Sequence, residues 1–511
     1  MFVTRKMWLM IGEVALVALI VFGAAPALAG GEGDRPWYSG FTPILLLLGA
    51  IAIVIWRMPA VKEDFFGQLA HTRDTRYRLR RMSNWLLLGA TYAFLYWGRY
   101  NLNPAIEALG GKQMVADFNW VFGIGTATYG VSFLINGPLT DRLGGRFSIL
   151  MSACGAAVAN LGMGVVCGMN HHGDLSADQL FWWLMILYAV NMYFQSFGAV
   201  AIVKCNAAWF HVRERGVFGA IFGILISLGI YFAYDWSFLI LRDLKLPVAW
   251  AFLAPAMALA ATFVLDLLFV RNRPSEAGFI DIRTGDATAG EVGPPDPPLA
   301  VFRMMWGDWV IMTIACIEFC SGFLRQSLMQ LYRLFAKSTG ITDSFVYVNW
   351  GMLLCIAGIL GGVFAGTISD RVFGSRRGPV AAVLYIGLLL GSVGMCFLLG
   401  SPYLGPLVIA MSLCVIGVHG MLSGTASMDF GGVKNAGIAV GLIDGFVYAG
   451  TALQSLLYAN TLPKGGTEAA DPSNWWFWPI AMIPIACLGL VLSYRIRNEK
   501  PKPKQAAAVR S

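Results

Sequence analysis

The chain has 511 residues, of which 57% are hydrophobic and only 13% are charged, with a formal net charge of +8. A soluble protein carries about a quarter charged residues, so this composition excludes an ordinary soluble domain. Many separate runs reach about 20 apolar residues, the length of a helix that spans a bilayer, and the alternating pattern of barrel strands is absent. We therefore expect an all-α polytopic membrane protein whose positive charge needs no nucleic acid.

The first 84 residues precede the main series of spans. Residues 1–29 combine a basic start at Arg5 and Lys6 with an apolar stretch and the triplet Ala27-Leu28-Ala29. This pattern is typical of a cleavable signal peptide, with an uncleaved anchor as the alternative. Residues 30–84 add one extra span at 41–56 and a basic segment, which the positive-inside rule places in the cytoplasm.

From Trp85 onward the sequence predicts twelve spans in two sets of six, one set in 85–270 and the other in 306–494. The expected limits are 85–109, 120–139, 148–168, 179–206, 217–239, 248–270, 306–334, 346–367, 379–399, 406–428, 437–460 and 475–494. Between the sets, 271–305 contains the run GPPDPP, which predicts a linker. The charge rule places this linker and the basic tail, 495–511, in the cytoplasm beneath an inner (plasma) membrane.

A short motif recurs after the second span of each half, as GPLTDRLGGR and as GTISDRVFGSRR. Its aspartates, Asp141 and Asp370, are 370 − 141 = 229 positions apart. Arg99 and Arg325, which lie deep in the first span of each half, are 325 − 99 = 226 positions apart. Nearly equal offsets are expected of duplicated six-helix halves.

The repeated pattern G-x-x-(S/T)-D-R-x-x-G resembles the signature between helices two and three of the major facilitator superfamily. The resemblance implies a twelve-helix fold that works by alternating access. We expect Asp141 and Asp370 to hold basic groups or helix ends across the cytoplasmic face, where they gate and do not bind substrate. The expected gating set is Asp141, Arg142, Arg146, Asp370 and Arg371.

A charge at the depth of Arg99 or Arg325 costs about 3 kcal/mol on insertion scales, so it is rarely accidental. A guanidinium remains charged in a dry site and offers a planar fork to phosphate oxygens. One arginine from each half could therefore bind one anion between the halves. The alternative is pairing with acids or snorkelling to the interface, and we expect snorkelling for Arg333, near a span end.

The first-helix sequence YAFLYWGRYNLN, 92–103, resembles that of the organophosphate:phosphate antiporters, which include glycerol-3-phosphate, hexose-phosphate and eukaryotic sugar-phosphate carriers. Their first helix is aromatic-rich and ends in an arginine, with an asparagine two residues later. Tyr92, Tyr96 and Arg99 share one helix face at i, i+4 and i+7. The match in the seventh helix is GFLR, which ends at Arg325. We expect Tyr92, Tyr96 and both arginines to bind substrate.

The sequence also departs from the bacterial glycerol-3-phosphate branch. Phe133 stands where that branch has a basic residue in the second helix, and Ala208 stands where it has a histidine. Lys204 could supply a charge to the substrate instead, or it could be an interfacial lysine at a helix end. The family resemblance survives these differences, but the identity of the substrate does not carry over.

Two buried acids complete the candidate substrate site. Glu318 precedes Arg325 by seven residues on the same face, and it could neutralise Arg325, take up a proton or contact a substrate hydroxyl. Asp444 is a candidate counter-charge or hydroxyl acceptor on a helix whose glycines predict close packing at Gly437, Gly441 and Gly445. His419 is interpreted as a core histidine more readily than as a substrate contact.

We therefore predict a monomeric secondary transporter that exchanges an organophosphate for inorganic phosphate. A sugar-phosphate receptor of the same fold and a carrier for a non-phosphorylated anion such as a carboxylate are the alternatives. No nucleotide loop, metal-ligand cluster or nucleophile constellation appears, so we expect no enzyme, cofactor or metal. The nine cysteines lie in or beside apolar spans and predict no disulfide framework.

Overall fold

The computed structural model describes residues 75–210, 223, 225–282, 297–371, 373 and 377–498, and for 363–364, 366–371 and 424–436 it describes the backbone alone. All of them belong to one unit, Glu63–Ser511. The expected signal peptide, the extra N-terminal span, the proline-rich part of the linker and the end of the tail lie outside the described residues.

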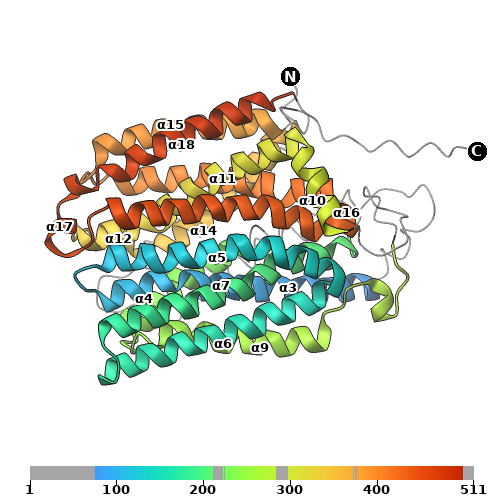
Figure 1. Ribbon diagram of the computed structural model, residues 1–511, viewed down its shortest axis with the longest axis horizontal. Coiled ribbons are helices and arrows are strands. Elements are labelled where there is room, and N and C mark those ends of the chain that lie inside the picture. The colour runs from blue at the N-terminus through green and yellow to red at the C-terminus, as the bar shows by residue number, and fades with distance from the viewer. Residues whose placement is uncertain are drawn as a thin grey trace, which may run out of the picture. The chain divides into compact units, whose positions relative to one another are not determined.

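Long helices before the linker run back and forth beside one another (Figure 1). They are α3 (Thr75–Tyr100), α4 (Leu102–Leu109), α5 (Met114–Leu143), α6 (Gly145–His172), α7 (Ala177–Ala207), the helical segment Leu225–Asp243 with the π-helical pieces η4 (Phe232–Trp236) and η5 (Leu239–Asp243), and α9 (Trp250–Phe269). Helix α3 includes residues 75–84, which precede the expected span start at Trp85, because the arginine-rich stretch is also helical. The break between α3 and α4 precedes Pro104, which has no N–H to donate to Tyr100.

The second half follows the same plan with α10 (Pro298–Gly307), α11 (Trp309–Met329), α12 (Leu331–Ser338), α13 (Phe345–Val348), α14 (Trp350–Arg371), α15 (Arg377–Leu398), α16 (Leu404–Thr461), α17 (Gly466–Ala470) and α18 (Phe477–Arg495). Residues 298–305 of helix α10 lie within the range expected to be linker. Its Val301 and Met305 are buried against Ile311 of α11 and Ile438 of α16, so this apolar end of the linker packs as a helix.

Helix α16 folds back on itself. Ser423 Oγ donates to Asp444 Oδ1 at 2.5 Å, although the two residues are 21 positions apart. In a straight helix that separation would be about 30 Å. The chain therefore reverses between two arms, Leu404–Ser423 and Gly437–Thr461, which correspond to the two separate spans that the sequence predicts here.

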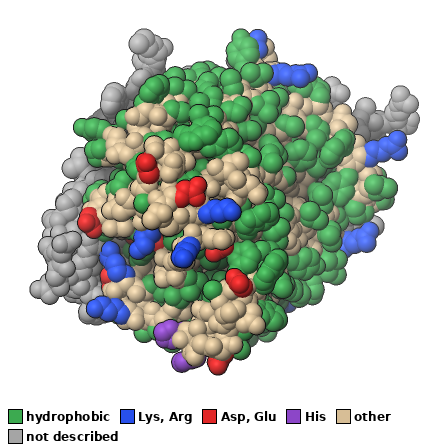
Figure 2. All heavy atoms as spheres, turned by 60° about the vertical axis from the view of Figure 1, so that its left-hand side comes forward, with side chains coloured by type: hydrophobic (Ala, Val, Ile, Leu, Met, Phe, Trp, Pro, Cys, Tyr) green, Lys and Arg blue, Asp and Glu red, His purple; other side chains and the backbone are tan. Residues whose placement is uncertain are grey.

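Ten helical segments within the described residues are long and apolar enough to cross a membrane. Large apolar side chains such as Phe397 and Leu390 are exposed on the flanks of the bundle. Figure 2, turned toward the end that carries α4 and α17, shows charged side chains gathered on that end and hydrophobic ones covering the flank beside it. The chain is thus an all-helical polytopic membrane protein, with lipid as the solvent of its flanks.

The two halves approach closely where α5 crosses the second arm of α16. A Cβ atom on Gly137 would lie 2.6 Å from the carbonyl oxygen of Gly437. A Cβ atom on Gly441 would lie 2.6 Å from the carbonyl oxygen of Phe133. Only glycine permits backbones to meet at this distance, so the prediction of close packing is confirmed for Gly437 and Gly441, whereas a Cβ atom on Gly445 would meet the Gly130 carbonyl oxygen at an ordinary 3.5 Å.

Candidate functional site

Arg99 lies at the centre of the bundle and is completely buried. Its Nε donates to Gln195 Oε1 at 2.8 Å, while Nη1 and Nη2 donate to the hydroxyls of Tyr448 and Tyr129, both at 2.7 Å. The guanidinium carbon also lies 4.8 Å from the ring centroid of Tyr96. These partners are neutral, so they orient the guanidinium and leave its positive charge for an anion.

The residues around Arg99 form a cage to which four helices contribute: Tyr96 from α3, Tyr129 from α5, Gln195 from α7 and Tyr448 from α16. Tyr92 packs edge-on against Tyr96, with ring centroids 5.2 Å apart, which extends the aromatic face of α3 that leads to Arg99. Tyr448 comes from the second half of the chain and is 349 positions from Arg99. The cage therefore joins the two halves through a single hydrogen bond to a charged group.

Arg325 occupies the equivalent place in the second half and is only 4% exposed. Its Nε and Nη2 atoms have no hydrogen-bond partner among the described residues. Leaving buried donors of a charged group unsatisfied is costly, by more than the 1–3 kcal/mol typical of neutral groups. The fork of Arg325 is therefore available to a ligand, whereas that of Arg99 is already held in place.

Two carboxylates of the second half lie within electrostatic range of Arg325 without pairing with it. Asp444 interacts with both Arg325 and Arg99, and Glu318 interacts with Asp444 and Arg325. The hydrogen bonds of these acids go elsewhere: Asp444 accepts from Ser423, and Glu318 Oε2 lies 2.8 Å from His419 Nδ1. His419 is therefore the partner of a buried acid.

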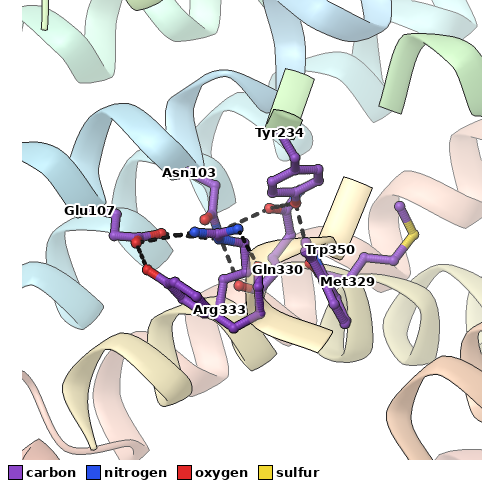
Figure 3. A network of polar contacts seen from close by, with 8 residues as sticks. Asn103, Glu107, Tyr234, Met329, Gln330, Arg333 and Trp350 are labelled. Carbon is purple, nitrogen blue, oxygen red and sulfur yellow. Dashed lines mark hydrogen bonds and ion pairs between the residues drawn. The ribbon is translucent and has the colours of Figure 1, made fainter. Parts of the chain in front are cut away.

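At the end of the bundle that carries α4, the halves are joined by an ion pair (Figure 3). Arg333 Nε lies 3.1 Å from Glu107 Oε2 and Nη2 lies 3.2 Å from Oε1. The Tyr347 hydroxyl also donates to Glu107, and the guanidinium stacks on the ring of Phe238 at 3.6 Å. Arg333 is 1% exposed, so the expectation of snorkelling is wrong: a carboxylate from the other half satisfies its charge inside the protein.

A second set of contacts lies beside this pair, as Figure 3 shows. Asn103 donates to the backbone and side-chain oxygens of Gln330 at 3.0 and 3.1 Å, and the Tyr234 hydroxyl donates to Gln330 Oε1 at 2.7 Å. Nearer the centre, Gln326 donates to the Tyr100 hydroxyl at 2.9 Å. These bonds close the space between the halves at the end that carries α4.

Asp141 joins the halves at the opposite end. Its carboxylate accepts from the backbone N–H groups of Gly437 and Ile438 at 3.2 and 3.1 Å, and from Lys204 at 2.6 Å. Available N–H groups are characteristic of the first turn of a helix, where a carboxylate also complements the helix dipole. Asp141 thus holds the start of the second arm of α16 against α5 and α7.

The remaining candidates are distributed differently from their prediction. Lys204, predicted as a possible substrate ligand, pairs with Asp141 at the end of α7. Arg142 is exposed, and Arg146 donates to the carbonyl of Leu267 at 2.7 Å within its own half. Asp370 and Arg371 end α14, but their side chains lie outside the described ones.

The sequence patterns did not predict Tyr129, Gln195 and Tyr448 as site residues. One signal could have found Tyr448, which follows Asp444 by four residues and so shares its helix face. Tyr129 lies four residues before Phe133, which stands where the bacterial glycerol-3-phosphate branch has a basic residue. The Tyr129 hydroxyl accepts a hydrogen bond from Arg99. No pattern in α7 marks Gln195.

Comparison with known proteins identifies one matching family model and several relatives. The family model described as Major Facilitator Superfamily matches residues 88–455. Membrane sensor protein UhpC of Escherichia coli (strain K12) is 24% identical over 427 residues, which cover 79% of this chain and 89% of that protein. The glycerol-3-phosphate transporter of Bacillus subtilis (strain 168) is 26% identical over 444 residues, covering 82% and 92%. A Chlamydia pneumoniae protein named "Probable hexose phosphate transport protein" is 22% identical over 469 residues, covering 85% and 94%.

Proposed function

Because the chain belongs to the major facilitator superfamily, a family of membrane transporters and not of enzymes, we propose that it exchanges an organophosphate for inorganic phosphate across the inner membrane. The chain is 26% identical to the glycerol-3-phosphate transporter of Bacillus subtilis and 22% identical to the Chlamydia pneumoniae protein named for hexose phosphate transport. The substrate would be a sugar phosphate or glycerol phosphate, and the carrier would work as a monomer with its linker and tail in the cytoplasm.

The buried fork of Arg325 is the observation that carries this proposal. Its unsatisfied donors lie in the interior of a membrane protein, and Arg99 at the matching position is held only by neutral groups. A phosphate monoester carries about −1.5 to −2 charges near neutral pH, which matches two guanidinium groups. Tyr92, Tyr96, Glu318 and Asp444 would line the same site.

Contacts between the halves at both ends support alternating access. The pair Glu107–Arg333 would open toward the outside, and the bonds of Asp141 would open toward the cytoplasm together with Asp370 and its neighbours. In full, the carrier would have twelve spans in two halves, plus one extra N-terminal span. An anion held by one arginine of each half would draw the halves together and lower the barrier to switching.

Exchange in vesicles tests the proposal. Proteoliposomes loaded with labelled phosphate are challenged from outside with glycerol 3-phosphate and a panel of sugar phosphates. We expect label to leave only when an accepted organophosphate or phosphate is present. Vesicles without protein and vesicles with Arg99→Lys are the controls, and wild-type vesicles that retain all label under every condition would contradict transport.

Sensing is a second candidate function, favoured by the similarity to the sensor protein UhpC over most of both chains. A sensor of this fold would bind the phosphate compound through the same arginines without moving it. The vesicle experiment separates the two functions when combined with a binding measurement, because a sensor would bind phosphate and still retain the label.

A further inference from the structure

The deepest acid in the second half is paired with a histidine and has an unused oxygen. Glu318 is completely buried, its Oε2 lies 2.8 Å from His419 Nδ1, and its Oε1 has no hydrogen-bond partner among the described residues. His419 is 18% exposed. The two residues come from α11 and from the first arm of α16, and they are 101 positions apart in sequence.

Several charged and titratable groups face Glu318. Arg325 and Cys320 lie on its own helix, His419 and Asp444 come from the two arms of α16, and Tyr385 comes from α15. Arg325 is the one cation in this set that stays charged at any relevant pH. A carboxylate at Glu318 therefore partly neutralises the empty anion site, together with Asp444.

Binding of a phosphate dianion reverses this balance. With no anion bound, ionised carboxylates at Asp444 and Glu318 would balance the positive charges of Arg99 and Arg325, with which they interact. A bound dianion neutralises both arginines, so the two carboxylates become excess negative charge in a low-dielectric interior. Proton uptake by one of them removes part of that excess.

Building on the proposed function, we infer that Glu318 and His419 form a proton-binding pair that takes up one proton when the phosphate group binds to Arg325. The proton comes from water and is held between Glu318 Oε2 and His419 Nδ1, which turns a negative pair into a neutral one. Substrate and proton then cross together, and the carrier moves less net charge than the dianion alone would.

Asp444 is the competing acceptor, and its hydrogen bond argues against it. Ser423 donates to Asp444 Oδ1 at 2.5 Å, which stabilises the ionised form of that carboxylate. Glu318 has no such neutral donor in the described structure, because its one partner is itself a titratable ring. The proton should therefore bind to the Glu318–His419 pair before it binds to Asp444.

Calorimetry on the purified full chain measures the proton directly. Inorganic phosphate is titrated into wild-type protein at one pH in two buffers of different ionisation enthalpy, which gives the number of protons taken up per phosphate. We expect Glu318→Gln to take up about one proton fewer than wild type. The double variant Glu318→Gln/His419→Asn keeps a neutral hydrogen-bonded pair and should show the same loss.

The matched control is the exposed His171→Asn, which should keep the wild-type proton number. Phosphate affinity of the wild type should fall with rising pH more steeply than that of Glu318→Gln, by up to about tenfold per pH unit. Unchanged proton uptake in Glu318→Gln, or its loss only in Asp444→Asn, would overturn the inference. Wild-type protein that binds no phosphate at all would instead refute the proposed function on which it rests.

Discussion

Glu107 and Arg333 form a buried ion pair between residues that are 226 positions apart. Arg99 and Arg325 have the same separation, 325 − 99 = 226, and so do Tyr100 and Gln326, which are joined by a hydrogen bond. Matching positions of the two halves therefore meet across the bundle. Two matched pairs, Glu107–Arg333 and Tyr100–Gln326, are joined directly in this way.

Replacement of either central arginine by lysine should nearly abolish phosphate exchange. Lysine keeps the charge but loses the planar fork, which at Arg325 is available to phosphate oxygens and at Arg99 is held by Gln195, Tyr448 and Tyr129. We expect Arg99→Lys and Arg325→Lys each to lower labelled-phosphate exchange by about a hundredfold or more, since a lost bidentate charged contact costs several kcal/mol. Arg242→Lys at the exposed surface is the control, and near-normal exchange by either central variant would remove the proposed site.

Loss of one partner of the Glu107–Arg333 pair should destabilise the protein strongly. Glu107→Gln leaves Arg333 buried without its counter-charge, a change that costs about 3–5 kcal/mol in buried pairs. The double variant Glu107→Gln/Arg333→Gln should lose less stability than Glu107→Gln alone, as measured by thermal unfolding of purified protein.

The surface pair Arg242–Asp243, whose side chains are 52% and 41% exposed, provides the control. Asp243→Asn should change stability by about 1 kcal/mol or less. If Glu107→Gln proves equally mild, the pair does not hold this end of the bundle closed.

Gly137→Ala should separate α5 from α16. Its Cβ would lie 2.6 Å from the carbonyl oxygen of Gly437, and overpacking of this kind costs about 1–3 kcal/mol. We expect both a lower unfolding temperature and slower exchange. Gly168→Ala is the matched control, because a Cβ there meets no atom within 4 Å and alanine favours the helix by up to about 1 kcal/mol. If Gly137→Ala and Gly168→Ala had the same unfolding temperature and exchange rate, close packing would not explain the glycine at position 137.

Asp141→Asn should weaken closure at the other end of the bundle. The amide keeps the size of the side chain but loses the charge that faces Lys204 and the N–H groups of Gly437 and Ile438. Charge-assisted hydrogen bonds contribute about 1.5–3 kcal/mol each, so we expect at least a tenfold slower exchange with phosphate binding retained. Asp174→Asn, at an exposed turn, is the control. If Asp141→Asn exchanged phosphate as fast as Asp174→Asn, a gating role for Asp141 would be excluded.

Local patterns in the chain were sufficient to predict the helical membrane fold, the internal repeat and the importance of the two central arginines. Each depends on features within a few tens of residues: apolar length, charge placement, a short motif and residues on one helix face. The spacing of Gly437 and Gly441 predicted close packing for the same reason. The break of α16 into two arms also follows from the apolar lengths on either side of it.

The partners of the buried charges depended on tertiary structure alone. Arg333 looked like a snorkelling residue because its span end is near, yet Glu107 from the other half lies beside it. Glu318 shares a helix face with Arg325, but its hydrogen bond goes to His419, 101 positions away. A buried charge is satisfied by whichever group the packing of distant helices brings within about 3 Å, and helix periodicity carries no information about that distance.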